Sequence, residues 1–195
     1  MANEVNCRIR LLSEDKDKIE QMLDLIEERL DSQTESEKVT NLCKSFYEDV
    51  KLSESGNVLY EWTYDNLGSK WVYFNDFNSN DTFSVISANY LPKEFIFRVY
   101  TILKTIDENL KIEVEFEDES YQPVGAMVIK KDTDGNLMYI ISEDYDYEYP
   151  DLDFDDDEYQ SKMEEFYETI YDGISDLLST CHYYIDNGKG ISLSL

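Results

Sequence analysis

The sequence predicts an α+β fold: a mixed or antiparallel sheet covered by helices on one face, with an extra C-terminal helix. Short segments of alternating apolar residues are interspersed with segments of helical apolar spacing. Their order, strand, helix, strands, helix, strands, helix, is that of a split βαβ unit. Only three prolines and seven glycines occur in 195 residues, which favours a single domain over 1–195 without a linker.

The first half of the chain begins with a strand and a helix. Apolar and polar residues alternate from Val5 to Leu12, which predicts a half-buried strand. Ser13 is a suitable N-cap for a helix to about Leu30, whose apolar residues recur every three or four positions. The same patterns, less marked, predict a helix over 34–49 and strands over 58–64, 70–74 and 82–90. A predicted turn at 66–68 places Trp62 and Trp71 on paired strands.

The second half continues the alternation. Pro92 suits the first turn of a helix that runs to about Glu108. Residues 111–117 alternate strictly, which predicts a strand with three glutamates on its outer face. An Asp-Thr-Asp-Gly turn sequence at 132–135 predicts a hairpin of strands 125–131 and 136–142. A last helix begins near Tyr159, and 191–195 is a short strand or a frayed end.

Several short motifs resemble the YubB-type ferredoxin-like family of plasmid and phage proteins. The resemblance covers 1–142 and implies a ferredoxin-like sandwich without an iron–sulfur cluster, a mobile-element origin, and no catalytic residues. The chain departs from the family pattern in Trp71-Val72-Tyr73-Phe74, where the family has Trp-Asn-Ala-Tyr, and in an acidic insertion after residue 142. The matching residues are Met1-Ala2-Asn3, Trp62, Asn66-Leu67-Gly68-Ser69-Lys70-Trp71, Pro92, and Lys111 to Glu119 followed by Tyr121 and Gly125.

Net charge narrows the class of function. Acidic residues number 44 against 17 basic ones, which gives a net charge of −27. Such a surface repels nucleic acid and membranes and attracts basic surfaces. With 42% hydrophobic and 14% aromatic residues, the chain is not a disordered acidic tail. We therefore expect a basic, nucleic-acid-binding protein as the partner, with no direct binding of nucleic acid or membrane.

One stretch, 143–158, concentrates this charge: it holds ten acidic residues and no basic one, with aromatic residues between them. Spaced carboxylates can imitate duplex phosphates, and aromatic rings can anchor a protein contact. The alternative interpretation is a solvated loop that aids solubility. The residues predicted to bind the partner are Glu143, Asp144, Tyr145, Asp146, Tyr147, Glu148, Tyr149, Asp151, Asp153, Asp155, Asp156, Asp157 and Glu158.

The rest of the chain is acidic as well. Without 143–158 it still holds 34 acidic and 17 basic residues, and 1–142 alone has 28 and 15. Self-repulsion on this scale destabilises a compact state, which favours a function that engages a basic partner. The expected surface is thus an extended negative face rather than one loop.

Metal and cofactor sites are not predicted. Asp151, Asp153 and Asp155 have the spacing of an EF-hand loop. The sixth position is Asp156 instead of the Gly that permits the turn of the loop. The twelfth is Lys162 instead of the Glu that binds calcium through two oxygens, so the sequence does not match the motif.

Catalysis has little support in the sequence. His182 is the only histidine, and Cys181 beside it would point to a different side of a helix. No phosphate-binding loop, dinucleotide fingerprint or hydrolase motif occurs. We expect a protein that is not an enzyme.

Three unpaired, widely spaced cysteines, Cys7, Cys43 and Cys181, and an N-terminus unlike a signal peptide favour a reducing, cytoplasmic compartment. The leading hypothesis is an acidic inhibitor of mobile-element origin that presents a DNA-mimic-like surface to a basic partner such as a host-defence nuclease. The alternative is an acidic accessory or structural protein without mimic activity.

Overall fold

One antiparallel sheet organises the chain. The computed structural model describes residues 3–30, 38–150 and 158–193, in which seven strands take the order β2-β3-β1-β4-β5-β6-β7. The strands are β1 (Glu4–Leu12), β2 (Val72–Ser79), β3 (Thr82–Ala88), β4 (Lys111–Asp118), β5 (Val124–Lys131), β6 (Leu137–Asp144) and β7 (Ile191–Ser192). The helices are α1 (Lys16–Leu30), α2 (Lys38–Phe46), α3 (Tyr60–Leu67), α4 (Lys93–Leu103) and α5 (Tyr159–Asp186).

The prediction of an α+β fold is confirmed, and within the described residues every strand pair of the sheet is antiparallel. The first four strands with α1 and α4 follow the order of a split βαβ unit, with β1 between β3 and β4. The ferredoxin-like assignment is not confirmed for the chain, because the sheet continues beyond β4 through three more strands.

The main core lies between the sheet and helices α1 to α4. Val5, Cys7, Ile9 and Leu11 of β1 are all buried, as the alternating pattern predicts. β4 alternates in the same way, and Trp62 of α3 joins this core. β5 is buried along nearly its whole length, because helices cover both faces of the sheet at this strand.

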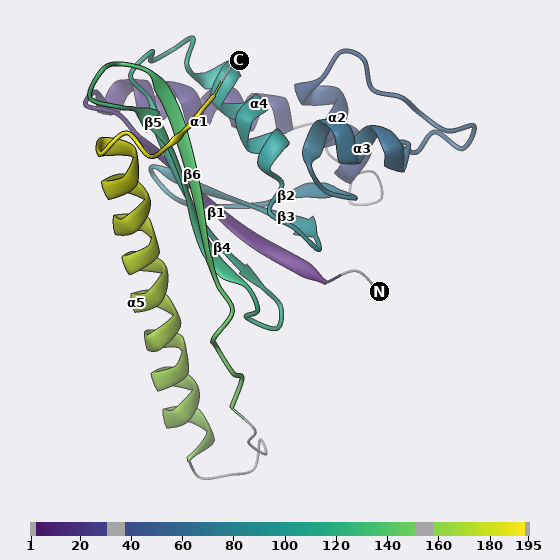
Figure 1. Cartoon of the computed structure of the whole chain (residues 1–195). Coiled ribbons are helices and arrows are strands. Elements are labelled where there is room, and N and C mark those ends of the chain that lie inside the picture. The colour runs from purple at the N-terminus through teal and green to yellow at the C-terminus, as the bar shows by residue number, and fades with distance from the viewer. Residues whose placement is uncertain (1–2, 31–37, 151–157, 194–195) are drawn as a thin grey trace.

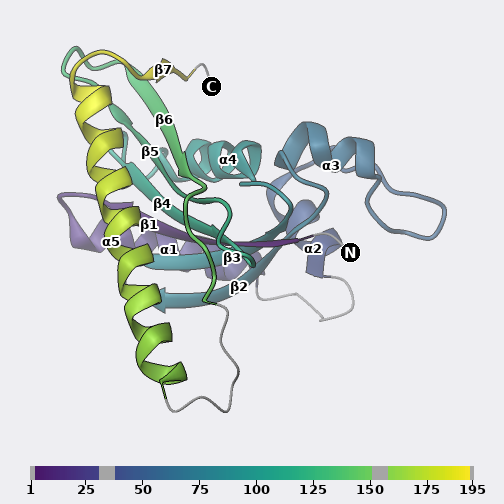
Figure 2. The same cartoon turned by 60° about the horizontal axis from the view of Figure 1, so that its bottom comes forward.

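Helix α5 corrects the expectation of helices on one face only. It packs against the opposite face, over β5 and β6, where Cys181 and Ile185 meet Ala126 and Val128. Figures 1 and 2 show α5 on one side of the sheet and α1 and α4 on the other. The reason is in β5: its even-numbered residues are as apolar as its odd-numbered ones, so both faces need cover.

The strand predicted over 58–64 is wrong, because α3 begins at Tyr60. A short run of aromatic and branched residues does not distinguish the two periods, and here Trp62, Thr63 and Leu67 fall on one buried helical face. Gly68, with φ 74°, ends the helix in the left-handed conformation. Trp62 therefore lies on a helix against Tyr47, with ring centroids 5.1 Å apart, rather than on a strand paired with that of Trp71.

Several boundaries also differ from the predicted ones. The capping side chain of α1 is Asp15, whose Oδ1 accepts the N–H of Asp17 at 3.0 Å, while Ser13 donates to Asp107 instead. α4 ends at Leu103 rather than near residue 108, and β2 runs over 72–79 instead of 70–74. The hairpin at 132–135 is confirmed, with Gly135 at φ 85°.

Candidate functional site

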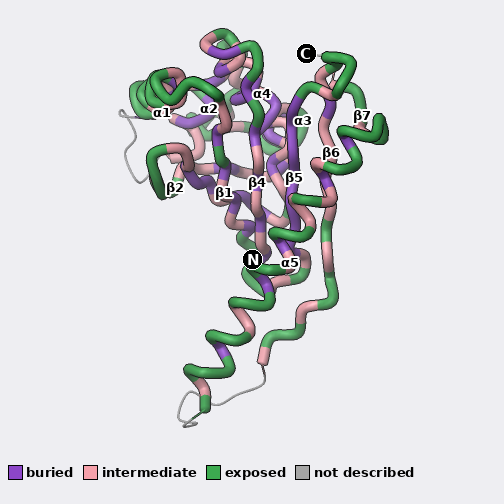
Figure 3. Tube along the Cα trace, turned by 90° about the vertical axis from the view of Figure 1, so that its left-hand side faces the viewer, coloured by how far each residue is buried: buried purple, intermediate pink, exposed green. Residues whose placement is uncertain are grey.

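The acidic tract and the beginning of α5 form one projection. Figures 1 and 3 show the chain leaving β6 and running beside the N-terminal part of α5, beyond the end of the sheet. We call residues 143–150 and 158–176 the acidic arm. It contains ten acidic residues and one basic residue, Lys162, which pairs with Glu158 at 2.8 Å.

The structure places eight of the thirteen predicted partner-binding residues on this arm. Glu143 and Asp144 are the last residues of β6 rather than part of a loop, opposite Gly125 and Val124 of β5. The Oδ1 atom of Asp144 accepts the N–H of Asp146 at 3.0 Å. Four of the acidic side chains are exposed: Glu143, Asp146, Glu148 and Glu158. The remaining five lie outside the described residues, as does the EF-hand-like spacing: Asp151, Asp153, Asp155, Asp156 and Asp157.

Two of the three predicted anchor tyrosines attach the arm to its own helix. The hydroxyl of Tyr147 lies over Gly173 of α5, and Gln122 Nε2 donates to the Tyr147 carbonyl at 2.6 Å. Tyr149 stacks on Tyr121 with centroids 6.1 Å apart and meets Phe166 edge-on at 5.5 Å. These contacts hold 145–150 against α5, although the segment has no regular secondary structure.

Tyr145 is oriented differently from the other two. Its side chain is 57% exposed, and its hydroxyl donates to Glu143 Oε2 at 2.8 Å. That hydrogen bond to a carboxylate raises the pKa of Tyr145, with a smaller contribution from burial. Tyr145 is thus the predicted anchor whose ring remains available to a partner.

Sequence reasoning missed a row of acids on the helical side of the arm. Glu164, Glu168, Asp172 and Asp176 recur every fourth residue and are all exposed. We call these four the helix stripe. Successive members are separated by about 6 Å of helix rise. The sequence does contain the signal, because these four acids recur at intervals of four residues beyond the tract. The prediction considered only the denser cluster at 143–158.

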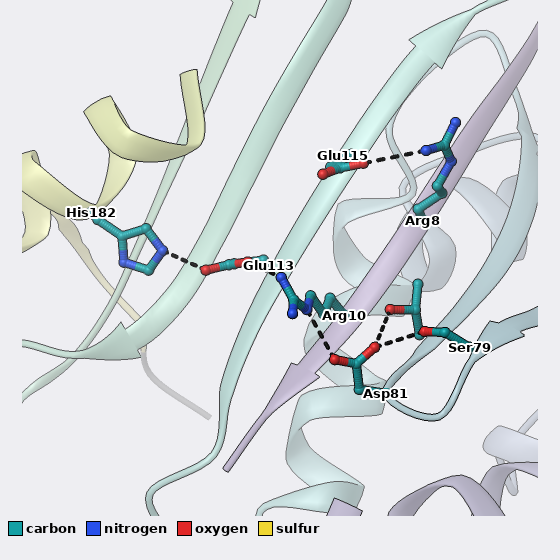
Figure 4. Close-up of polar contacts among 8 residues, drawn as sticks. Arg8, Arg10, Ser79, Asp81, Glu113, Glu115 and His182 are labelled. Atoms are coloured by element: carbon teal, nitrogen blue, oxygen red, sulfur yellow. Dashed lines mark hydrogen bonds and ion pairs between the residues drawn. The ribbon is translucent and has the colours of Figure 1, made fainter. Parts of the chain in front are cut away.

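The outer face of β1 and β4 neutralises part of its own charge. Arg10 Nε lies 3.1 Å from Asp81 Oδ2, and Arg10 Nη1 lies 3.9 Å from Glu113 Oε2 (Figure 4). Arg8 pairs with Glu115 at 3.6 Å. Burial opposes ionisation of Asp81, but hydrogen bonds from Ser79, Thr82 and Arg10 outweigh it and lower its pKa. The glutamates of β4 are therefore less available to a partner than the sequence alone indicates.

The only histidine has a structural contact on this face. His182 Nε2 and Glu113 Oε1 lie 2.8 Å apart, which ties the end of α5 to β4 (Figure 4). Cys181 has a separate partner, the Ala126 carbonyl at 3.8 Å, and burial raises the pKa of its thiol to about 11. A thiol with this pKa is a poor nucleophile near neutral pH.

In the described ranges, no three side chains of His, Cys, Asp or Glu are grouped so that they could hold a metal ion. The helices within these ranges include none with the length and apolarity needed to cross a bilayer. Comparisons with known proteins found no matching family model, curated protein or solved structure. The resemblance to the YubB-type family therefore stays a prediction.

Proposed function

We propose that this protein is a non-enzymatic inhibitor that presents its acidic arm to the basic surface of a nucleic-acid-binding protein, such as a host-defence nuclease. The single observation that carries the proposal is the concentration of charge on a projecting element. The arm, as the structure describes it, holds ten acidic residues and one basic residue, a net charge of −9 in 27 residues.

The charge density of the arm approaches that of nucleic acid. From 158 to 176 the helix rises about 27 Å. Ten acidic residues of the arm accompany this length, or about one per 3 Å, against about one per 1.7 Å of axis in duplex DNA. A protein surface built to neutralise phosphates would release counterions on binding such an arm as well.

The helix stripe is costly for the isolated molecule. Each like-charged pair four residues apart destabilises a helix by about 0.2–0.5 kcal/mol. Three such pairs succeed one another in Glu164, Glu168, Asp172 and Asp176. A charge spread evenly for solubility would not need this arrangement, whereas a basic partner would offset its cost. This favours the inhibitor over an accessory protein that is acidic for solubility.

The test replaces the helix stripe by amides, E164Q/E168Q/D172N/D176N. The partner is first recovered by a pull-down at low salt, purified, and bound to a labelled duplex. We expect the unmodified protein to displace the duplex in 150 mM salt. The stripe variant should need about tenfold more protein, because it lacks four exposed charges that act on a partner within a Debye length of about 8 Å.

The control variant is D17N/E20Q/D24N/E28Q on α1. It removes the same number of Asp and Glu side chains from an exposed helical face, so the net charge changes equally. Equal loss of displacement in both variants would show that total charge matters and not the arm. Undiminished displacement by the stripe variant would contradict the proposal directly.

We also propose that residues 4–118 form a ferredoxin-like unit to which β5, β6, β7 and α5 were added. The order of β1 to β4 and the side on which α1 and α4 lie support this assignment. In this view the added elements supply the arm. The expected consequence is that the body tolerates changes in the arm without losing its core.

A further inference from the structure

A second feature lies at the base of the arm and includes its residues Glu143 and Tyr145, on the face of the sheet that carries α4. A pocket of about 570 Å³ opens between the end of α3, the start of α4 and the end of β6. Buried Val5 and Phe116 and half-buried Ile141 supply an apolar lining. Three tyrosines also line it and are well exposed: Tyr64 (46%), Tyr90 (62%) and Tyr145 (57%).

These rings lack the contacts that other exposed tyrosines of this protein make. Arg8 lies over the Tyr171 ring at 5.3 Å, and Lys70 lies over the Tyr60 ring at 4.8 Å. In the part of the chain that the structure describes, no basic side chain and no second ring is stacked on Tyr64, Tyr90 or Tyr145. The faces of three rings are thus open at one pocket.

The charge of the pocket is negative. Asp65, Glu94 and Glu143 line it, against a single basic residue, Lys93, whose Nζ is already 3.6 Å from Glu94 Oε1. Glu143 is held in place by the hydroxyl of Tyr145. A cation that enters the pocket would therefore meet carboxylates and aromatic faces together, and each attracts positive charge.

Close contacts within the chain hold the walls of the pocket. Gly68 lets α3 approach α4 closely: a Cβ at this position would lie 3.3 Å from the backbone nitrogens of Lys93 and Glu94. The loop that carries Tyr90 is fixed at Asn89, which exchanges hydrogen bonds of 2.8 and 3.0 Å with Asn3. A formed pocket loses little conformational entropy when a side chain binds.

We propose that this pocket accepts an arginine side chain of the basic partner that the acidic arm attracts. The inference rests on the proposed function, and it adds a specific contact to an otherwise diffuse attraction. The methylene groups of the arginine would cover half-buried Pro123 and Ile141, and its planar guanidinium would lie against the tyrosine rings and donate to Glu143. Arginine fits better than lysine because its flat, weakly hydrated group stacks on rings and binds carboxylates with two hydrogen bonds.

The experiment titrates the whole protein with a blocked Gly-Arg-Gly peptide and follows the ring signals of labelled tyrosines by NMR. We expect saturable shifts at Tyr64, Tyr90 and Tyr145, and none at Tyr183, which is 59% exposed on α5. The matching peptide with citrulline, a neutral isostere, should bind about fivefold more weakly or worse. Shifts spread equally over all exposed tyrosines, or equal binding of both peptides, would overturn the proposal.

Variants separate this inference from the proposed function. Y90A should lower the affinity for the arginine peptide severalfold. Y90F should preserve that affinity because the ring face remains, and Y183A is the matched control. If Y90A binds the peptide as well as the unmodified protein, the pocket is not the site, whatever the arm does. If the stripe variant still displaces the duplex while the peptide binds at the three rings, the proposed function of the arm is contradicted, whereas arginine binding in the pocket is supported.

Discussion

At the scale of single residues, Asp107 joins three segments through one buried carboxylate. Its Oδ2 accepts from Ser13 Oγ at 2.6 Å, and its Oδ1 accepts from the Asn109 N–H at 3.1 Å and from Lys18 Nζ at 3.3 Å. Burial by itself would raise the pKa of Asp107, but these hydrogen bonds together lower it. The connection after β1 is thereby fastened to the connection before β4.

We expect D107N to lower the free energy of unfolding by about 1.5–3 kcal/mol at pH 7, the usual worth of hydrogen bonds to a charged group. Because the folded pKa lies below the unfolded one, this stabilisation is present above about pH 4 and is lost as the pH falls through the folded pKa. Urea unfolding of both proteins from pH 7 to pH 3 checks it.

The control for this prediction is D134N, which changes an exposed aspartate in the turn between β5 and β6. Its unfolding midpoint should stay close to that of the unmodified protein throughout the pH range. A difference between D107N and the unmodified protein that stays constant down to pH 3 would contradict the assigned role of the carboxylate.

At the scale of elements, the attachment of the arm depends on Gly173. An added Cβ would lie 1.7 Å from the hydroxyl of Tyr147, so the ring must move away in G173A. Alanine favours the helix by about 1 kcal/mol over glycine, which offsets the lost contact, and overall stability should change little. The expected effect is local: residues 145–150 separate from α5.

The pKa of Tyr147 reports this separation. Burial raises it first, and the nearby carboxylates of Asp144, Asp176 and Asp146 raise it further. In G173A we expect it to fall toward the ordinary value of about 10. Titration of ring-labelled tyrosine by NMR measures the change, with S175A on the exposed side of α5 as the control. An unaltered Tyr147 pKa in G173A would show that the ring does not depend on the glycine.

Elements also show how much the sequence can predict. The strict alternation of β1 and β4 and the turn at 132–135 identified their strands, because one buried face leaves a period of two. α3 was missed because eight residues are too few to establish a helical period. The side of the sheet that α5 covers depends on packing between distant segments, which no local pattern records.

The candidate site divides in the same way. The charge of 143–158 is visible in the sequence, since it needs only composition. The pocket is not, because Tyr64 on α3, Tyr90 after β3 and Tyr145 after β6 meet only when the strands take their order in the sheet. Two of the predicted anchors proved to contact α5 and Tyr121, a pairing that requires the fold itself.

At the scale of the whole molecule, the net charge of −27 opposes folding through self-repulsion. We expect the urea midpoint to rise when sodium chloride increases from 50 to 500 mM, because the Debye length falls from above 10 Å to below 8 Å. The urea midpoint of the stripe variant should be higher at 50 mM salt and should rise less as salt is added. Chloride is preferable to sulfate, which stabilises proteins by exclusion. A midpoint that is independent of salt would mean that repulsion is already compensated within the fold.

The position of the acidic arm also gives the molecule a direction. The connections at the other end of the sheet, 12–16, 79–82, 104–111, 131–137 and 186–191, carry five basic and eight acidic residues, so the net charge of that end is only −3. The protein is therefore an electric dipole whose negative pole is the arm. The field of a positively charged surface therefore orients the protein before contact, with the arm toward that surface. Fewer random collisions are then needed for each productive encounter.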